Sequence, residues 1–243
     1  MADPVRLTLT LAAASATAVA ASQTPGGAGN LVLTGGANNT AGPTLIQGKI
    51  YTNYALMDVA RRIQVASAGS ADGAIVFTII GFNRDMQPIT ETVTGVVAAT
   101  PVATKRDFLI VTSVGVSAAT AAAASVGTNT TGSTAWVYVS PVGAPWSLSA
   151  ALVGVSGAAC NCQIEHTYDD PNAEIDPPMG GFILENAAIP PFTFITGAAQ
   201  VALAVGAGYE ITYANQPIVA HRMTITSGTG VVAFYSLQSG TVS

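Results

Sequence analysis

Short strand-like segments recur along the whole sequence, and each ends at a cluster of Gly, Asn, Asp or Pro. In residues 89–97 the threonines alternate with Ile89, Glu91 and Val93, and residues 74–82 form a β-branched and aromatic run. A period of two is typical of strands, whereas the Ala-rich segment 118–124 is too short to be a stable helix alone. Further strands are predicted at residues 62–67, 108–117, 135–139, 148–155, 160–168, 209–213, 221–226 and 231–237. The pattern predicts an all-β protein with two β-sandwich or jelly-roll-like domains.

A weak internal repeat supports two related domains. Residues 60–67 and 220–227 share the order Ala, basic residue, Arg, apolar, polar, Ile or Val, small residue, Ser. Residues 127–134 between them have the composition of a linker. We therefore expect an extended N-terminal arm or strand at 1–30, a first β-domain at 31–130 and a second at 131–243.

The charge content excludes several classes of protein. Only 9% of the 243 residues are charged against 49% hydrophobic, whereas about 25% charged is usual. The two Lys and six Arg are scattered and the net charge is −5, so nucleic-acid binding is not expected. The sequence has no stretch of about 20 strongly apolar residues, so no membrane span is predicted. Leu7, Leu9 and Leu11 alternate with threonines, which favours a strand over a cleaved export signal.

One segment combines potential zinc ligands. Cys and His are the preferred ligands of zinc, and the ligands of one ion must converge on it. Cys160, Cys162 and His166 would all point to the same face of a strand. His166 would lie about 13 Å along the strand from Cys162, too far for one ion without a bend. We favour the interpretation that the two cysteines are core thiols, and we expect no cofactor.

An acidic loop follows that strand. Five oxygen-bearing side chains could hold calcium: Asp169, Asp170, Asn172, Glu174 and Asp176. The prolines within and after this segment, and the lack of a glycine-centred loop, favour an ordinary polar loop instead.

Catalysis is not expected from this sequence. It has only two histidines, no Gly-x-Ser-x-Gly nucleophile turn, and neither a dinucleotide nor a P-loop fingerprint. Contacts with other proteins are the better expectation. The interface candidates are the apolar residues Pro190, Pro191, Phe192, Phe194 and Trp146, and the basic pair Arg61 and Arg62. The basic pair has an alternative interpretation as strand-edge charges that prevent unwanted pairing.

The strand and turn style resembles a family of viral proteins. Residues 60–63, 71–81, 88–95 and 105–114, together with 153–156, 163–171 and 222–238, are similar to β-rich virion proteins of tailed bacteriophages. The segment 160–162 and the Pro-rich insert 174–192 depart from that style. The resemblance implies a structural role and carries no catalytic residues.

The expected function is therefore a structural component of a tailed-phage virion, most specifically a capsid decoration or cement protein. Its partners would be the major capsid protein or other virion proteins and further copies of itself, in a homo-oligomer located in the virion after assembly in the host cytoplasm. A neck, tail or fibre protein is the alternative within this class. A glycan-binding β-sandwich is the alternative outside it, if Trp136, Trp146, Tyr168 and Tyr209 surround one cleft.

Overall fold

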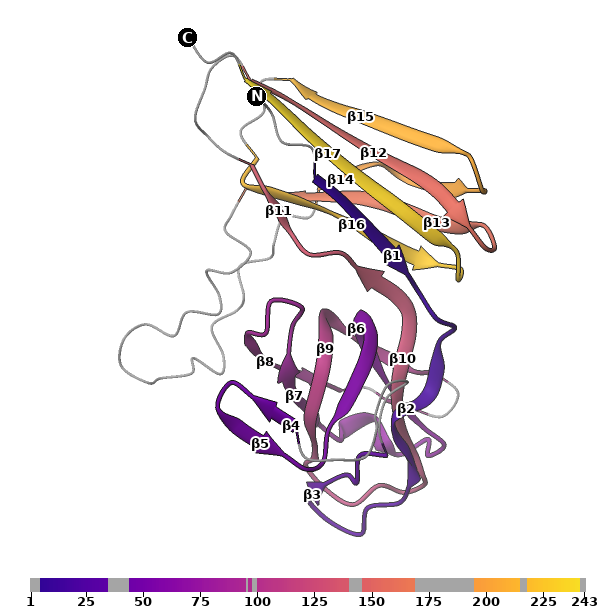
Figure 1. The fold of residues 1–243 in the computed structure, drawn as a ribbon. Coiled ribbons are helices and arrows are strands. Elements are labelled where there is room, and N and C mark those ends of the chain that lie inside the picture. Colours follow the sequence, from indigo (N-terminus) through magenta and orange to yellow (C-terminus); the bar gives the residue numbers. More distant parts are fainter. Residues whose placement is uncertain are drawn as a thin grey trace. The chain divides into compact units, whose positions relative to one another are not determined.

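The computed structural model describes residues 5–34, 44–94, 96–97, 100–139, 146–168, 195–214 and 218–240. These residues form seventeen strands and one short 3-10 turn, η1 (Asp72–Ala74), so the predicted all-β class is confirmed. The chain divides into two compact units, described separately below (Figure 1). The first unit is Ala12–Gly132, and the second combines Met1–Leu11 with Ser133–Ser243.

The first unit is built on long antiparallel strands. They are β2 (Ser15–Gln23), β3 (Gly29–Asn30), β4 (Thr44–Ile46), β5 (Lys49–Tyr51), β6 (Ala55–Ser67), β7 (Phe77–Phe82), β8 (Pro88–Val93), β9 (Val102–Val116) and most of β10 (Ala124–Ser133). In the main sheet β10 pairs with β6, β6 with β9, β9 with β7, and β7 with β8. β2 also pairs with β10, β3 pairs with β9, and β4 and β5 form a separate hairpin.

Alternating residues of these strands form the core of the first unit. Phe77 and Ile79 of β7 lie in one buried cluster with Phe108, Val111 and Val114 of β9. Each such side chain contributes about 1.5–3 kcal/mol when it leaves water. The β-branched and aromatic run noted in the sequence is therefore a core strand.

The second unit contains two sheets. Its strands are β1 (Val5–Thr10), β11 (Val137–Tyr138), β12 (Trp146–Ser156), β13 (Cys160–Thr167), β14 (Ile195–Leu203), β15 (Gly208–Ala214), β16 (Ala220–Ser227) and β17 (Val231–Gly240). One sheet has the order β1-β17-β12-β15, and in the other β13 lies between β14 and β16, with β11 paired to β16. The sheets pack face to face, because the His221 ring of β16 lies 5.2 Å from the Phe234 ring of β17.

The segment predicted to be an arm is paired within the protein. Of residues 1–30, the described part forms β1, β2 and β3, and β1 pairs with β17 from Val5↔Ser236 to Thr10↔Val231. Leu9 and Leu11 are fully buried, so these leucines form core contacts. β1 is thus a strand of the second unit, and contact of residues 1–30 with a neighbouring subunit stays a prediction.

Gly127 permits the close approach of β2 to β10. A Cβ atom at this position would lie 1.9 Å from the carbonyl oxygen of Ser15. No side chain fits there unless the strands separate. By contrast, a Cβ on Gly26 would meet nothing within 4 Å.

We predict that Gly127→Ala destabilises the first unit by about 1–3 kcal/mol, the usual cost of overpacking. Gly26→Ala should leave its stability within about 0.5 kcal/mol, as expected for a surface change. Urea unfolding followed by circular dichroism, with hydrogen exchange of β10 and β2, measures both. Equal stability of the two variants would contradict this account of Gly127.

Candidate functional site

The two cysteines are buried neighbours on β13. Both are free thiols, with the Sγ atoms 3.6 Å apart. Burial, together with the neighbouring Cys160, raises the pKa of the Cys162 thiol, so the thiolate that zinc requires is disfavoured. Among the described residues no three His, Cys, Asp or Glu side chains gather as metal ligands. The geometry therefore supports the core-thiol interpretation.

Two histidines face each other across β13 and β16. His166 pairs directly with His221, and both lie within the sandwich, at 3% and 0% exposure. The His221 Nε2 atom is 2.8 Å from the Ser236 hydroxyl on β17, while the His166 ring packs edge-on against Tyr168. Burial lowers the pKa of both imidazoles, and the nearby His166 contributes to a His221 pKa of about 4. Both rings are therefore neutral at pH 7.

A buried ion pair occupies the opposite side of the same two strands. Glu165 pairs directly with Arg222, whose Nε atom donates a 2.9 Å hydrogen bond to the carboxylate. Gln163 donates a second bond of 2.7 Å, and the Arg222 guanidinium lies 4.6 Å from the Trp136 ring centre. Burial alone would raise the pKa of Glu165, but the charge of Arg222 and these hydrogen bonds outweigh it and lower that pKa. With Arg222 against its ring, Trp136 does not offer a sugar-stacking surface on that side.

Arg61 of the predicted basic pair is buried, which corrects its assignment as an interface residue. Its side chain is 2% exposed and forms an ion pair with Asp58 at 3.1 Å. The other guanidinium nitrogen, Nη2, donates to the carbonyl oxygens of Ala12 and Asn129 at 2.9 and 2.7 Å. Because these hydrogen bonds tie β6 to two remote segments of the first unit, Arg61 stabilises the fold, and its guanidinium is not exposed on the surface of the single chain.

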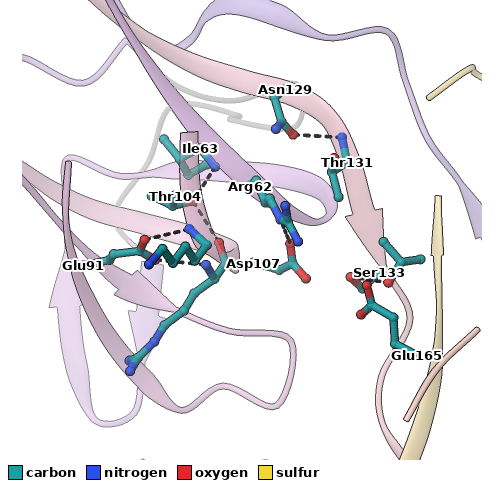
Figure 2. Close-up of polar contacts among 12 residues, drawn as sticks. Arg62, Ile63, Glu91, Thr104, Asp107, Asn129, Thr131, Ser133 and Glu165 are labelled. Carbon is teal, nitrogen blue, oxygen red and sulfur yellow. Dashed lines mark hydrogen bonds and ion pairs between the residues drawn. The ribbon is translucent and has the colours of Figure 1, made fainter. Parts of the chain in front are cut away.

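Arg62 is one-third exposed and stays an interface candidate. Its Nε atom lies 3.9 Å from a carboxylate oxygen of Asp107, directly opposite on β9 (Figure 2). The internal repeat aligns Arg62 with Arg222, which faces Glu165 in the same way. In both repeat segments the strand therefore places an arginine opposite an acidic residue of its neighbour.

Two other carboxylates of the first unit accept hydrogen bonds from nearby residues. Glu91 accepts hydrogen bonds from the backbone amides of Lys105 and Arg106 at 2.6 and 2.9 Å (Figure 2). Asp72 accepts from the Ser67 hydroxyl and from the Ala121 amide, and these bonds lower its pKa. These acids hold strand ends and turns in place.

Several predicted residues lie outside the described part of the chain. They are the acidic loop Asp169, Asp170, Asn172, Glu174 and Asp176, and the apolar candidates Pro190, Pro191, Phe192 and Phe194. Trp146 begins β12. A calcium site and an apolar anchor at these positions remain predictions.

Four of the exposed apolar side chains form two features that the sequence did not single out. Leu45 and Ile50 pair directly on the β4–β5 hairpin of the first unit and are 68% and 65% exposed. In the second unit, Tyr235 and Leu237 of β17 project from the four-stranded sheet, away from the sandwich interior. The alternation in residues 231–237 predicted a strand, but its outward face could be assigned only from the pairing.

None of the helices in the described chain is long and apolar enough to span a membrane.

No protein-family model and no curated protein matches the chain. A chain from the atomic structure of Sulfolobus turreted icosahedral virus matches at 14% identity, over 86% of this chain and 62% of its own, with a TM-score of 0.19. A chain from a structure described as the triple jelly roll fold and turret assembly in an archaeal virus matches at 11% identity, over 98% and 79%, also at 0.19. TM-scores this low establish no common fold and assign no function.

Acidification should destabilise the second unit. Unfolded histidine takes up its proton near pH 6.5 and folded His221 only near pH 4, so the unfolded state binds more protons between these values. The contribution of His221 to the free energy of unfolding is therefore fully present above pH 6.5. It is lost as the pH falls toward 4, and the loss is on the order of 3 kcal/mol. Both tryptophans, Trp136 and Trp146, lie in this unit, so their fluorescence reports its urea unfolding. A plot of the unfolding free energy against pH has a slope set by the number of protons taken up on unfolding. His221→Gln should reduce that slope by the equivalent of about one proton.

The exposed change Thr212→Gln serves as the control and should leave the slope as in the unmodified protein. A His221→Gln variant with an unchanged slope would show that His221 is not the group whose protonation opposes folding.

Removing one partner of the Glu165–Arg222 pair should destabilise the second unit strongly. Glu165→Gln leaves a buried cation without its counter-charge, which costs about 3–5 kcal/mol. The double variant Glu165→Gln with Arg222→Met removes both charges and should recover most of that loss. Tryptophan-detected urea unfolding of the single and double variants measures the coupling. Simple additivity of the two changes would mean that the pair is not coupled.

Proposed function

We propose that this chain is a structural subunit of a virus particle. The observation that carries the proposal is the low charge content of the chain, part of which is used inside the protein. Arg61, Asp72, Glu165 and Arg222 are all buried. Because only 9% of the residues are charged, the exterior carries few charges even with side chains such as Arg6, Lys49 and Glu210 exposed. Such a surface suits a protein covered by neighbouring subunits.

Within that class we propose a head decoration or cement protein of a tailed phage, with the major capsid protein as partner and the virion as location. This finer proposal rests on the sequence resemblance to tailed-phage virion proteins. A decoration protein works by adding interface area and needs no catalytic group. The Leu45–Ile50 pair on the β4–β5 hairpin is our candidate contact with the capsid. Exposed apolar side chains add to the free energy of binding when a partner removes them from water.

The purified chain should therefore co-sediment with empty heads that lack it, in a sucrose gradient. Replacing both Leu45 and Ile50 by Ser should abolish co-sedimentation without unfolding the protein, because both side chains are already in water. Val32→Ser, at another exposed apolar position of the first unit, is the matched control and should still bind.

Mass spectrometry of purified particles, heads and tails gives the location and copy number. A chain found in tails but not in heads would contradict the decoration role, and a chain absent from all particles would contradict the structural role altogether.

A further inference from the structure

The outer face of the four-stranded sheet in the second unit carries few charges and many small side chains. We define this outer face by the residues that point away from the sandwich interior: Arg6, Thr8, Ser149, Ala151, Val153, Gly208, Glu210, Thr212, Ala233, Tyr235 and Leu237. They alternate with buried residues such as Leu148, Leu152 and Phe234. Arg6 and Glu210 are the charged members, and they lie on the two edge strands.

One row of this outer face crosses all four strands. Arg6 pairs with Tyr235, Tyr235 with Ala151, and Ala151 with Glu210. The guanidinium of Arg6 lies over the Tyr235 ring, 5.4 Å from its centre, so these two side chains share one side of the sheet. Three strand spacings separate Arg6 from Glu210, about 14 Å, so the two cannot pair within one chain. The row therefore runs from a cation past a large side chain and a small one to an anion.

We infer that this outer face binds the same face of a second copy of the chain, through a twofold axis parallel to the strands between β17 and β12. Such an axis places β1 of one copy over β15 of the other and β17 over β12. Arg6 then faces Glu210 of the second copy, and Tyr235 faces its Ala151. The contact is self-complementary, as a twofold interface must be.

The other rows obey the same rule. Val153 pairs with Ala233 in one chain, and the twofold axis sets Val153 over the position of Ala233 in the second copy, whose small side chain is already covered by its own neighbours. In the next row on the other side, Leu237 pairs with Ser149 and would face the second copy's Ser149. Large side chains therefore meet small ones in each row, which allows two sheets to interdigitate at about 10 Å.

The size of the outer face sets the expected affinity. Four strands about 4.8 Å apart and about seven residues long present roughly 400 Å². This area lies below the roughly 800 Å² per partner of a standard interface, so we expect a dimer that dissociates on dilution. The inference deepens the proposed assembly role and rests on it, because it names the partner of one surface of the structural subunit.

Sedimentation of the full chain over roughly 1–500 µM tests the inference. We expect a concentration-dependent dimer that Ala151→Lys weakens by ~10-fold or more, because the long side chain takes the space that Tyr235 of the second copy would occupy. Val32→Lys, an equally drastic change at an exposed site of the first unit, should dimerise as the unmodified chain does. Tryptophan fluorescence and circular dichroism confirm that each variant is folded.

Reversing the charges of Arg6 and Glu210 tests whether these two residues face each other across the dimer. Arg6→Glu and Glu210→Arg should each weaken the dimer several-fold, and the double variant should restore most of the affinity. A monomer at every concentration, a dimer insensitive to Ala151→Lys, or a double variant without recovery would each overturn the inference. A monomeric chain that is still found in particles overturns the dimer alone, whereas a dimer absent from particles overturns the structural role alone.

Discussion

The pairing of β13 with β16 is the constraint on which the second unit depends. Because successive side chains alternate between the two faces of a sheet, this register places the Glu165–Arg222 pair on one side and the His166–His221 pair on the other. A slip by one residue would exchange them and would put an ion pair inside the sandwich beside Phe234. The polar pairs thus specify the register, while the apolar residues between them supply most of the stability.

The first unit uses charge in a comparable way. Arg61 joins β6 to the carbonyl oxygens of Ala12 and Asn129, and Glu91 holds the backbone at Lys105 and Arg106. Removing the partner of a buried charge costs far more than the pair itself contributes, so Arg61 is a sensitive position, whereas Glu91 is only half-buried. Because the sequence holds few charges and some of them are buried, much of the exterior is left to uncharged side chains. That low charge is the physical basis of the assembly role that we propose.

The strands could be predicted from sequence because period-two alternation and turn residues are local signals. The repeated segments 60–67 and 220–227 lie in two strands, β6 and β16, that each place an arginine opposite an acid. The role of Arg61 could not be predicted, because its acceptors Ala12 and Asn129 lie 49 and 68 residues away. The outer face of the second unit also required the pairing, since β1, β12, β15 and β17 are distant in sequence. The zinc hypothesis came from residue type and spacing, which do not tell whether a thiol is buried.

The central claim is that the exterior of this protein is covered by other subunits in a particle. Hydroxyl-radical labelling of Tyr235 and Leu237 tests it most directly, in the dilute free chain and in purified particles, with Val32 for comparison. The account predicts strong labelling of Tyr235 and Leu237 in the free chain, where they are 36% and 45% exposed, and protection of both in the particle. Equal labelling of these two side chains in both states would contradict it.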